Sequence, residues 1–151
     1  MSISIVKVAI DNELHKAALK LLFVQYSDET PADINPDVVD TLLSLPYFHG
    51  FLCYDQGEAT GFAICYESFS TYRQQFYLNI HDLMIAKPNR GKGLSRTLLE
   101  SVLQFSRDRK FLKVTLEVDD DNTIAKSLYA SCGFEDHQVK LKGLLHWQVY
   151  L

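Results

Sequence analysis

The sequence predicts a mixed α/β domain, because two hydrophobic periodicities alternate along the chain. Stretches in which every second residue is apolar have the period of a half-buried strand, and they are separated by stretches with the period of an amphipathic helix. The 151 residues contain no internal repeat, low-complexity tract or linker-like composition, and their number is ordinary for one domain. We therefore expect a single domain that covers residues 1–151.

The first half of the chain shows strand, helix and hairpin signals in turn. Alternation over residues 3–8 predicts a strand, and Asp11 can cap a helix that runs to about Tyr26. Two prolines mark a loop before a short apolar helix around residues 38–43. A turn that contains Gly57 then joins two strands. These strands are expected over residues 51–54 and 61–68.

In the second half of the chain, strand signals and helix signals alternate again. A strand over residues 76–86 leads into an amphipathic helix over residues 93–109, and clean alternation predicts a strand over residues 113–118. A helix over residues 122–132 stops at Gly133. Final strands are expected over residues 134–138 and 146–150. The order β-α-α-β-β-β-α-β-α-β-β predicts a mixed sheet of about seven strands flanked by four helices.

The strand over residues 76–86 contains a phase slip. Its apolar residues are Leu78 and Ile80, and then Leu83 and Ile85, so the period of two shifts by one residue. A β-bulge produces this shift, because it adds one residue, bends the strand and leaves backbone groups unpaired. The alternative is a strand that is buried on both faces.

Composition and charge argue against several classes of protein. The net charge of -4 and the pI of about 5.7 do not suit a nucleic-acid-binding surface. No window approaches the roughly 20 apolar residues of a membrane span, and the N-terminus does not read as a signal peptide. The three cysteines form no C-x-x-C and the histidines lack metal-ligand spacing. We expect a cytoplasmic protein that binds no metal, nucleic acid or membrane.

Acidic and basic residues are unevenly distributed. Residues 21–72 contain eight acids and no Lys or Arg, whereas residues 87–142 contain eleven Lys and Arg. One interpretation is a plain solvated acidic surface. The other is that one region attracts a cation and the other an anion.

The stretch Arg90-Gly91-Lys92-Gly93 stands at the start of the helix over residues 93–109. A helix N-terminus presents unpaired N–H groups and about half a positive charge, and glycines let a ligand approach the backbone closely. This combination predicts a phosphate-binding turn, whereas a simple connection would need one glycine and no cationic cluster. The sequence lacks the Walker A loop, and Arg96 occupies the third glycine position of the dinucleotide fingerprint.

The same stretch fits the pattern [RQ]-x-x-G-x-[GA], except that its last residue is Ser95. It resembles the acetyl-CoA pyrophosphate loop of the GNAT superfamily of N-acetyltransferases. The segment LEVDDDNTIAKSLYASCGF is similar to the family's strand, Asn, helix with Ala and Tyr, and Gly-Phe. The run over residues 61–95 is most similar to diamine (polyamine) N-acetyltransferases.

The resemblance implies a GNAT-like, largely antiparallel mixed sheet with a bulged fourth strand that splays from the fifth. The pantetheine arm of acetyl-CoA would lie in that gap, and Tyr129 would be the general acid that protonates the leaving sulfur. Its spacing alone would favour a core residue of an amphipathic helix, and it is the surrounding family pattern that favours the general acid. The implied cofactor-binding residues are Leu83, Met84, Ile85, Arg90, Gly91, Lys92, Gly93, Leu94, Ser95, Arg96 and Asn122.

The resemblance leaves the general base open. Glu117 matches the base of ribosomal-protein alanine N-acetyltransferases, and His81 occupies the position of a proposed Glu base in diamine N-acetyltransferases. A water chain with no single base is the third alternative. Glu117 also fits an exposed strand carboxylate that is paired with Lys113.

The expected activity is acetyl transfer from acetyl-CoA to a primary amine by direct attack on the thioester. Carboxylates in the loop after the first helix would attract a small basic amine such as a polyamine. The substrate-binding residues expected are Asp28, Glu29 and Asp82. The alternatives are a protein N-terminus or lysine as acceptor, an aminoglycoside or amino acid, or a non-catalytic acyl-CoA-binding regulatory domain. Because family members often dimerise, a homodimer is also expected.

Overall fold

The computed structural model describes residues 2–31, 33–136 and 147–151, and the chain divides into two compact units. The first unit is Met1–Glu117 and the second is Val118–Leu151. The first contains β1 (Ile3–Lys7), α1 (Glu13–Ser27), α2 (Val38–Ser44), β2 (Phe48–Asp55), β3 (Glu58–Ser70), β4 (Gln75–Ile85), a 3-10 turn (Lys87–Asn89), α3 (Leu94–Asp108) and β5 (Val114–Leu116), and the second contains α4 (Thr123–Ser131).

The strands form one mixed sheet in the order β1-β2-β3-β4-β5. The first three pairs are antiparallel, and β4 and β5 are parallel. In the described part of the chain the sheet has five strands, so the prediction of about seven is not matched, although the four helices are. Residues 134–136 and 147–151 form no strand, and the rest of both expected final strands lies outside the described residues. Short alternation cannot show whether a partner strand is available, which is why residues 134–136 and 147–151 could be predicted as strand without forming one.

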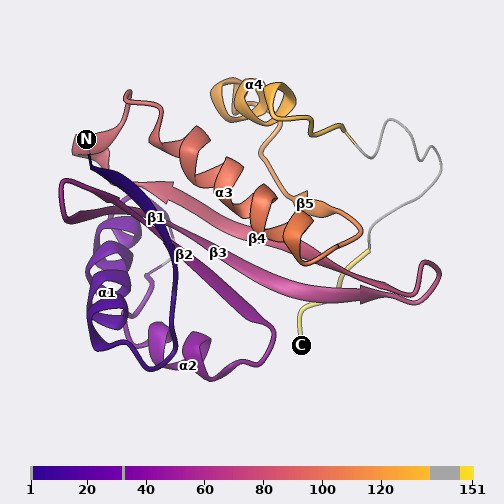
Figure 1. The fold of residues 1–151 in the computed structure, drawn as a ribbon, viewed down its shortest axis with the longest axis horizontal. Coiled ribbons are helices and arrows are strands. Elements are labelled where there is room, and N and C mark those ends of the chain that lie inside the picture. The colour runs from indigo at the N-terminus through magenta and orange to yellow at the C-terminus, as the bar shows by residue number, and fades with distance from the viewer. Residues whose placement is uncertain (1, 32, 137–146) are drawn as a thin grey trace. The chain divides into compact units, whose positions relative to one another are not determined.

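Helices cover both faces of the sheet in the first unit (Figure 1). On one face α1 contacts β3 and α2 contacts β2, and the core there includes Leu22, Phe23 and Phe62. On the other face α3 contacts β2, β3 and β4 through its buried side chains. These side chains are Leu94, Leu98, Leu99, Val102 and Ser106.

The cap of α1 differs by one residue from the prediction. The side chain of Asn12, rather than Asp11, accepts hydrogen bonds from the backbone N–H groups of Leu14 and His15, at 3.0 and 3.1 Å. Asparagine and aspartate are about equally good caps, so the residue that takes the role is decided by where the first helical turn begins.

The predicted bulge is present in β4. Ile64 of β3 lies opposite Asp82, and the next residue, Cys65, lies opposite Ile80. His81 therefore has no opposite residue. Because one residue is added, Asn79 and Asp82 both project toward the face that α1 covers, opposite Tyr66 and Ile64.

The pairing of β4 with β5 ends just before this bulge. The last pair is Ile80 with Leu116, and β5 ends there while β4 continues to Ile85. On the side away from β3, the backbone of Leu83, Met84 and Ile85 therefore has no β5 residue opposite it.

His49 lies in β2, against the aromatic rings of Phe105 and Phe111. Both ring nitrogens are buried, and neither has a hydrogen-bond partner among the described residues. Burial is the main cause that lowers the pKa of His49 to about 4, and the positive charges of Lys7 and Arg109 lower it further. The ring is therefore neutral at neutral pH.

The buried His49 should make the stability of the fold decrease in acid. Below the usual histidine pKa of about 6.5, the unfolded chain binds a proton that the folded chain accepts only near pH 4. The contribution of His49 to stability is therefore complete above pH 6.5 and is lost as the pH falls from 6.5 toward 4. Urea unfolding across this range should show less pH dependence for His49→Phe than for the wild type. An identical pH dependence in both proteins would contradict the assignment.

Candidate active site

The glycine-rich turn between β4 and α3 has the backbone that a close ligand approach requires. Gly91 and Gly93 have φ angles of 82° and 78°, in the left-handed region that favours glycine. A Cβ atom at either position would meet nothing within 4 Å, so the requirement is conformational and the space beside the turn is open. No side chain caps α3. The N–H groups and dipole of its first turn therefore favour an anion.

Arg90 connects this turn to the loop after α1. Its Nε donates a hydrogen bond to the backbone oxygen of Ile85 at 2.8 Å, and its guanidinium forms an ion pair with Glu29. Lys92 is exposed. The structure thus brings together Arg90, expected at the coenzyme, and Glu29, expected at the amine.

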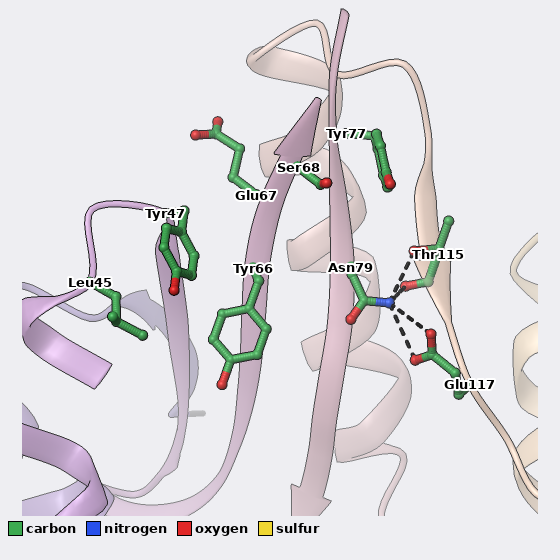
Figure 2. A pocket seen from close by; sticks show the side chains of 9 residues that line it. All are labelled: Leu45, Tyr47, Tyr66, Glu67, Ser68, Tyr77, Asn79, Thr115 and Glu117. Carbon is green, nitrogen blue, oxygen red and sulfur yellow. Dashed lines mark hydrogen bonds between the residues drawn. The ribbon is translucent and has the colours of Figure 1, made fainter. Parts of the chain in front are cut away.

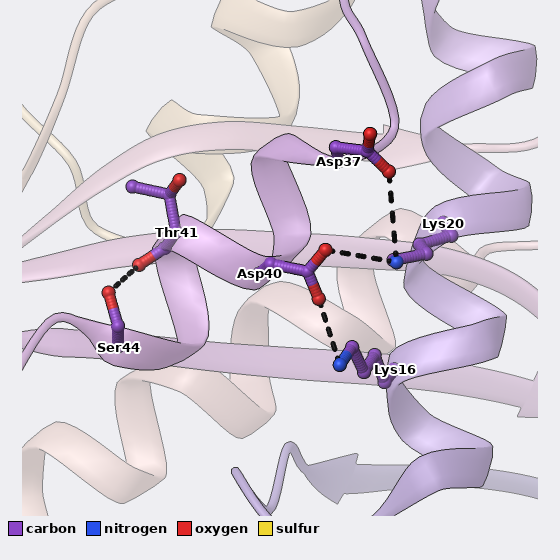
Figure 3. Close-up of polar contacts among 6 residues, drawn as sticks. All are labelled: Lys16, Lys20, Asp37, Asp40, Thr41 and Ser44. Atoms are coloured by element: carbon purple, nitrogen blue, oxygen red, sulfur yellow. Dashed lines mark hydrogen bonds and ion pairs between the residues drawn. The ribbon is translucent and has the colours of Figure 1, made fainter.

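Part of the acidic segment is already paired with lysines. Figure 3 shows Lys16 and Lys20 of α1 beside α2, where Lys16 contacts Asp40 at 2.8 Å. Lys20 contacts Asp40 at 3.1 Å and Asp37 at 3.9 Å. Both lysines precede the acidic segment in sequence, so counting charges along the chain overestimates the negative charge of this surface. Asp28 is exposed at the end of α1.

The bulge region contains two of the expected site residues. The exposed ring of His81 packs on Tyr66 with 5.4 Å between ring centroids. Asp82 accepts a hydrogen bond from the hydroxyl of Tyr26 at 3.1 Å. This bond ties the bulge to α1, so Asp82 is held in place rather than free to rotate.

A cleft of about 560 Å³ opens beside the bulge, across β3, β4 and β5 (Figure 2). Asn79 projects from β4 toward β5, and its amide nitrogen donates to the hydroxyl of Thr115 at 3.0 Å. The same nitrogen lies 3.3 Å from each carboxylate oxygen of Glu117. The cleft is lined by Leu45, Tyr47, Tyr66, Glu67, Ser68, Tyr77, Asn79, Thr115 and Glu117.

The partner of Glu117 is therefore Asn79. Lys113, the alternative partner that the strand alternation offered, places its ammonium over the ring of Tyr77, 5.1 Å from the centroid. Three residues that line the cleft were not predicted from the sequence, namely Asn79, Tyr66 and Tyr77. The spacing within each strand places Tyr66 with Ser68 on one face of β3, and Tyr77 with Asn79 on one face of β4. Only the register of β3 with β4 shows that these two pairs lie side by side.

The second unit contains the remaining expected residues. The side-chain oxygen of Asn122 caps α4 by accepting from the N–H of Ala125 at 3.1 Å, which leaves its amide nitrogen to donate elsewhere. Tyr129 packs against Phe134 within the same unit, with 5.9 Å between ring centroids. Burial raises the pKa of the Tyr129 phenol, so the group is protonated at neutral pH.

The part of the chain that the structure describes contains no group of three or more His, Cys, Asp or Glu residues that could hold a metal ion. None of its helices has both the length and the apolar character needed to cross a membrane.

Solved structures of acetyltransferases share this fold. One described as a probable acetyltransferase superposes with a TM-score of 0.82 at 22% identity, over 97% of this chain and 99% of the other. An aminoglycoside acetyltransferase from a soil metagenome, solved with sisomicin, has a TM-score of 0.78 at 18% identity, over 99% and 96% of the two chains. At these identities the likeness shows the fold alone.

Curated relatives match shorter segments. A thialysine N-epsilon-acetyltransferase of Caenorhabditis elegans is 35% identical over 81 residues, which are 54% of this chain and 50% of that protein. An N-alpha-acetyltransferase of Arabidopsis thaliana, MAK3, is 30% identical over 97 residues, which are 64% of this chain and 48% of that protein. The matches thus span about half the length of these two relatives. The model of the Acetyltransferase (GNAT) family matches residues 12–134, well over half of the sequence, and the chain therefore belongs to the GNAT acetyltransferase family.

Proposed function

We propose that this protein transfers an acetyl group from acetyl-CoA to a primary amine, by direct attack of the amine on the thioester. The observation that carries the proposal is the bulge at His81, which lies where the β4–β5 pairing ends. This arrangement leaves one side of the Leu83–Ile85 backbone open for a ligand, directly before a glycine turn suited to phosphate. The matched relatives are named as amine acetyltransferases, which supports the same reaction.

In this proposal the coenzyme follows the open backbone from the bulge to α3. Backbone groups of Leu83, Met84 and Ile85 would bond its pantetheine arm, and one of their N–H groups would stabilise the oxyanion. The backbone of residues 90–96 would hold the pyrophosphate. Asn122 would bond the pantetheine arm through its side chain.

The reaction requires a neutral amine, because an alkyl ammonium with a pKa near 10.4 has no free electron pair. The amine nitrogen forms a bond to the thioester carbon, and the carbon–sulfur bond then breaks. The proton that the nitrogen loses goes to a base or to water. The departing sulfur takes a proton from Tyr129, whose raised pKa keeps that proton available at neutral pH. Solvent returns the proton to Tyr129 afterwards.

Two side chains compete for the role of base, with a water chain as the third alternative. Glu117 borders the cleft and is oriented by Asn79, whereas His81 is the bulged residue itself and is exposed. Histidine has the pKa range that suits proton removal near neutral pH.

The acceptor in this proposal is a small basic amine such as a polyamine. Asp28, Glu29 and Asp82 would attract it, although Glu29 must then leave Arg90 or share it. The Arabidopsis relative, named as an N-alpha-acetyltransferase, supports a protein N-terminus as the alternative acceptor. A cytoplasmic location and a homodimer complete the proposal, and light scattering after size-exclusion chromatography tests the second. Tight coenzyme binding without turnover on any amine would instead indicate a regulatory acyl-CoA-binding domain.

Tyr129→Phe should lower kcat by about 100-fold, because the sulfur then leaves without its proton donor. The measurement is thiol release from acetyl-CoA over a panel of amines. Tyr72→Phe is the matched control, since this tyrosine is 97% exposed in the turn between β3 and β4. A Tyr129→Phe enzyme with the kcat of the wild type would remove Tyr129 from the mechanism.

The base can be identified from pH profiles of kcat/KM for Glu117→Gln and His81→Ala. Loss of the basic residue should remove the acidic limb of the profile, because that limb reports the base losing its proton. A changed limb in one variant alone assigns the base to that residue. Unchanged limbs in both would leave the water chain as the route.

Glu29→Gln should strengthen the binding of coenzyme A about threefold, because the carboxylate no longer competes with phosphate for Arg90. Calorimetric titration with coenzyme A measures the effect. Glu58→Gln, an exposed charge removal at the start of β3, is the control. Weaker binding in Glu29→Gln would show instead that the ion pair positions Arg90 for the phosphate.

A further inference from the structure

Asn79 lines the cleft at the place where β4 and β5 are paired. Asn79 and Thr115 are register partners in these two strands, and Glu117 follows Thr115 by two residues. Figure 2 shows the side chains of Thr115 and Glu117 turned toward Asn79. The last β4–β5 pair is Ile80 with Leu116, so Glu117 is the first residue that the strand pairing no longer holds. A side-chain contact must therefore fix its carboxylate.

One amide nitrogen supplies that contact. The side-chain nitrogen of Asn79 lies 3.3 Å from both carboxylate oxygens of Glu117, and 3.0 and 3.4 Å from the hydroxyl and backbone oxygens of Thr115. The carboxylate and the backbone carbonyl only accept hydrogen bonds, so a flipped amide would set its oxygen against three acceptors. The chemistry of these neighbours therefore fixes which end of the amide faces Glu117.

The donor that orients Glu117 carries no charge. Among the described residues, no Lys, Arg or His forms an ion pair with Glu117. Lys113 places its ammonium over the ring of Tyr77 instead. A neutral amide can hold a carboxylate in one direction without cancelling the negative charge that a base uses to take a proton from an ammonium group.

His81, the other candidate base, is held less closely. Its exposed ring packs on Tyr66, and no described residue forms a hydrogen bond with its imidazole. It is also not among the residues that line the cleft, whereas Glu117 is. A base has to point its lone pair at the proton that it removes. Of these two candidates, Glu117 is the one whose direction is fixed by a hydrogen bond.

We propose that Asn79 is a positioning residue that holds the carboxylate of Glu117 toward the cleft as the base of the reaction. The ammonium group of the acceptor loses one proton to a carboxylate oxygen of Glu117, and the neutral amine keeps the electron pair that attacks the thioester. Glu117 then gives the proton to solvent and returns to its charged form. This inference rests on the proposed acetyl transfer and assigns the base within it.

The kinetic test combines substitutions at the two positions. Asn79→Ala should lower kcat about tenfold and leave KM for acetyl-CoA unchanged, because a hydrogen bond to a charged group is lost. In a Glu117→Gln background the same substitution should cause no further loss, because Asn79 acts through Glu117. Gln75→Ala is the matched control, since it removes an exposed amide from the same face of β4. Additive losses, or a wild-type kcat in Glu117→Gln, would overturn the inference.

Exchanging donor and acceptor tests the contact without turnover. Asn79→Asp sets a second carboxylate against Glu117 and should lower the melting temperature, Tm. Adding Glu117→Gln restores one donor and one acceptor in reverse order. Thermal unfolding followed by circular dichroism should then show Tm returning toward the wild type, while kcat stays low because the base is gone.

The same measurement separates this inference from the proposed function. A restored Tm in the double variant, together with no acetyl transfer to any amine by the wild type, would support the contact and refute the transferase proposal. A double variant that is no more stable than Asn79→Asp alone would overturn the contact, and the inference with it, in an active enzyme as well.

Discussion

One extra residue in β4 determines how the two faces of the sheet are used. Before His81, β4 pairs on both sides, with β3 and with β5. After it, the pairing with β3 continues in a shifted register, while β5 has ended. Because β5 ends at Leu116, one side of the β4 backbone after the bulge has no β5 residue opposite it. The shift itself places Asp82 on the same face of the sheet as Asn79.

Charge pairing across elements changes how the surface should be interpreted. The acidic stretch of sequence and the basic stretch that follows it are not two separate surfaces, because Glu29 pairs with Arg90 across the fold. Lysines of α1 compensate carboxylates at α2. Glu117, which lines the cleft, contacts the amide nitrogen of Asn79 instead.

The position of Glu117 illustrates how neighbours restrict a side chain. Its carboxylate follows the last residue of β5 and would be mobile on its own. A single amide nitrogen, from Asn79, lies within 3.3 Å of both oxygens and also bonds Thr115. Because Asn79 and Thr115 are register partners, the orientation of Glu117 depends on the same strand pairing that ends at the bulge. A group fixed in this way loses less entropy when a substrate binds.

The sequence by itself determined the features that depend on neighbouring residues. The phase slip around His81, the glycine turn before α3 and the existence of four helices follow from local periodicity and backbone sterics, and the structure contains all of them. The glycine pattern also indicated the family to which the chain belongs.

Only the tertiary structure decided which residues meet across the chain. Local alternation could not show whether the last segments have partner strands, and the described residues form five strands rather than about seven. It could not show that Asn79 would reach Glu117, that three tyrosines from three different strands or loops would share one cleft, or that Arg90 would pair with Glu29. These contacts depend on strand register and on the packing of α1, which are set by the burial of whole hydrophobic faces rather than by any short pattern.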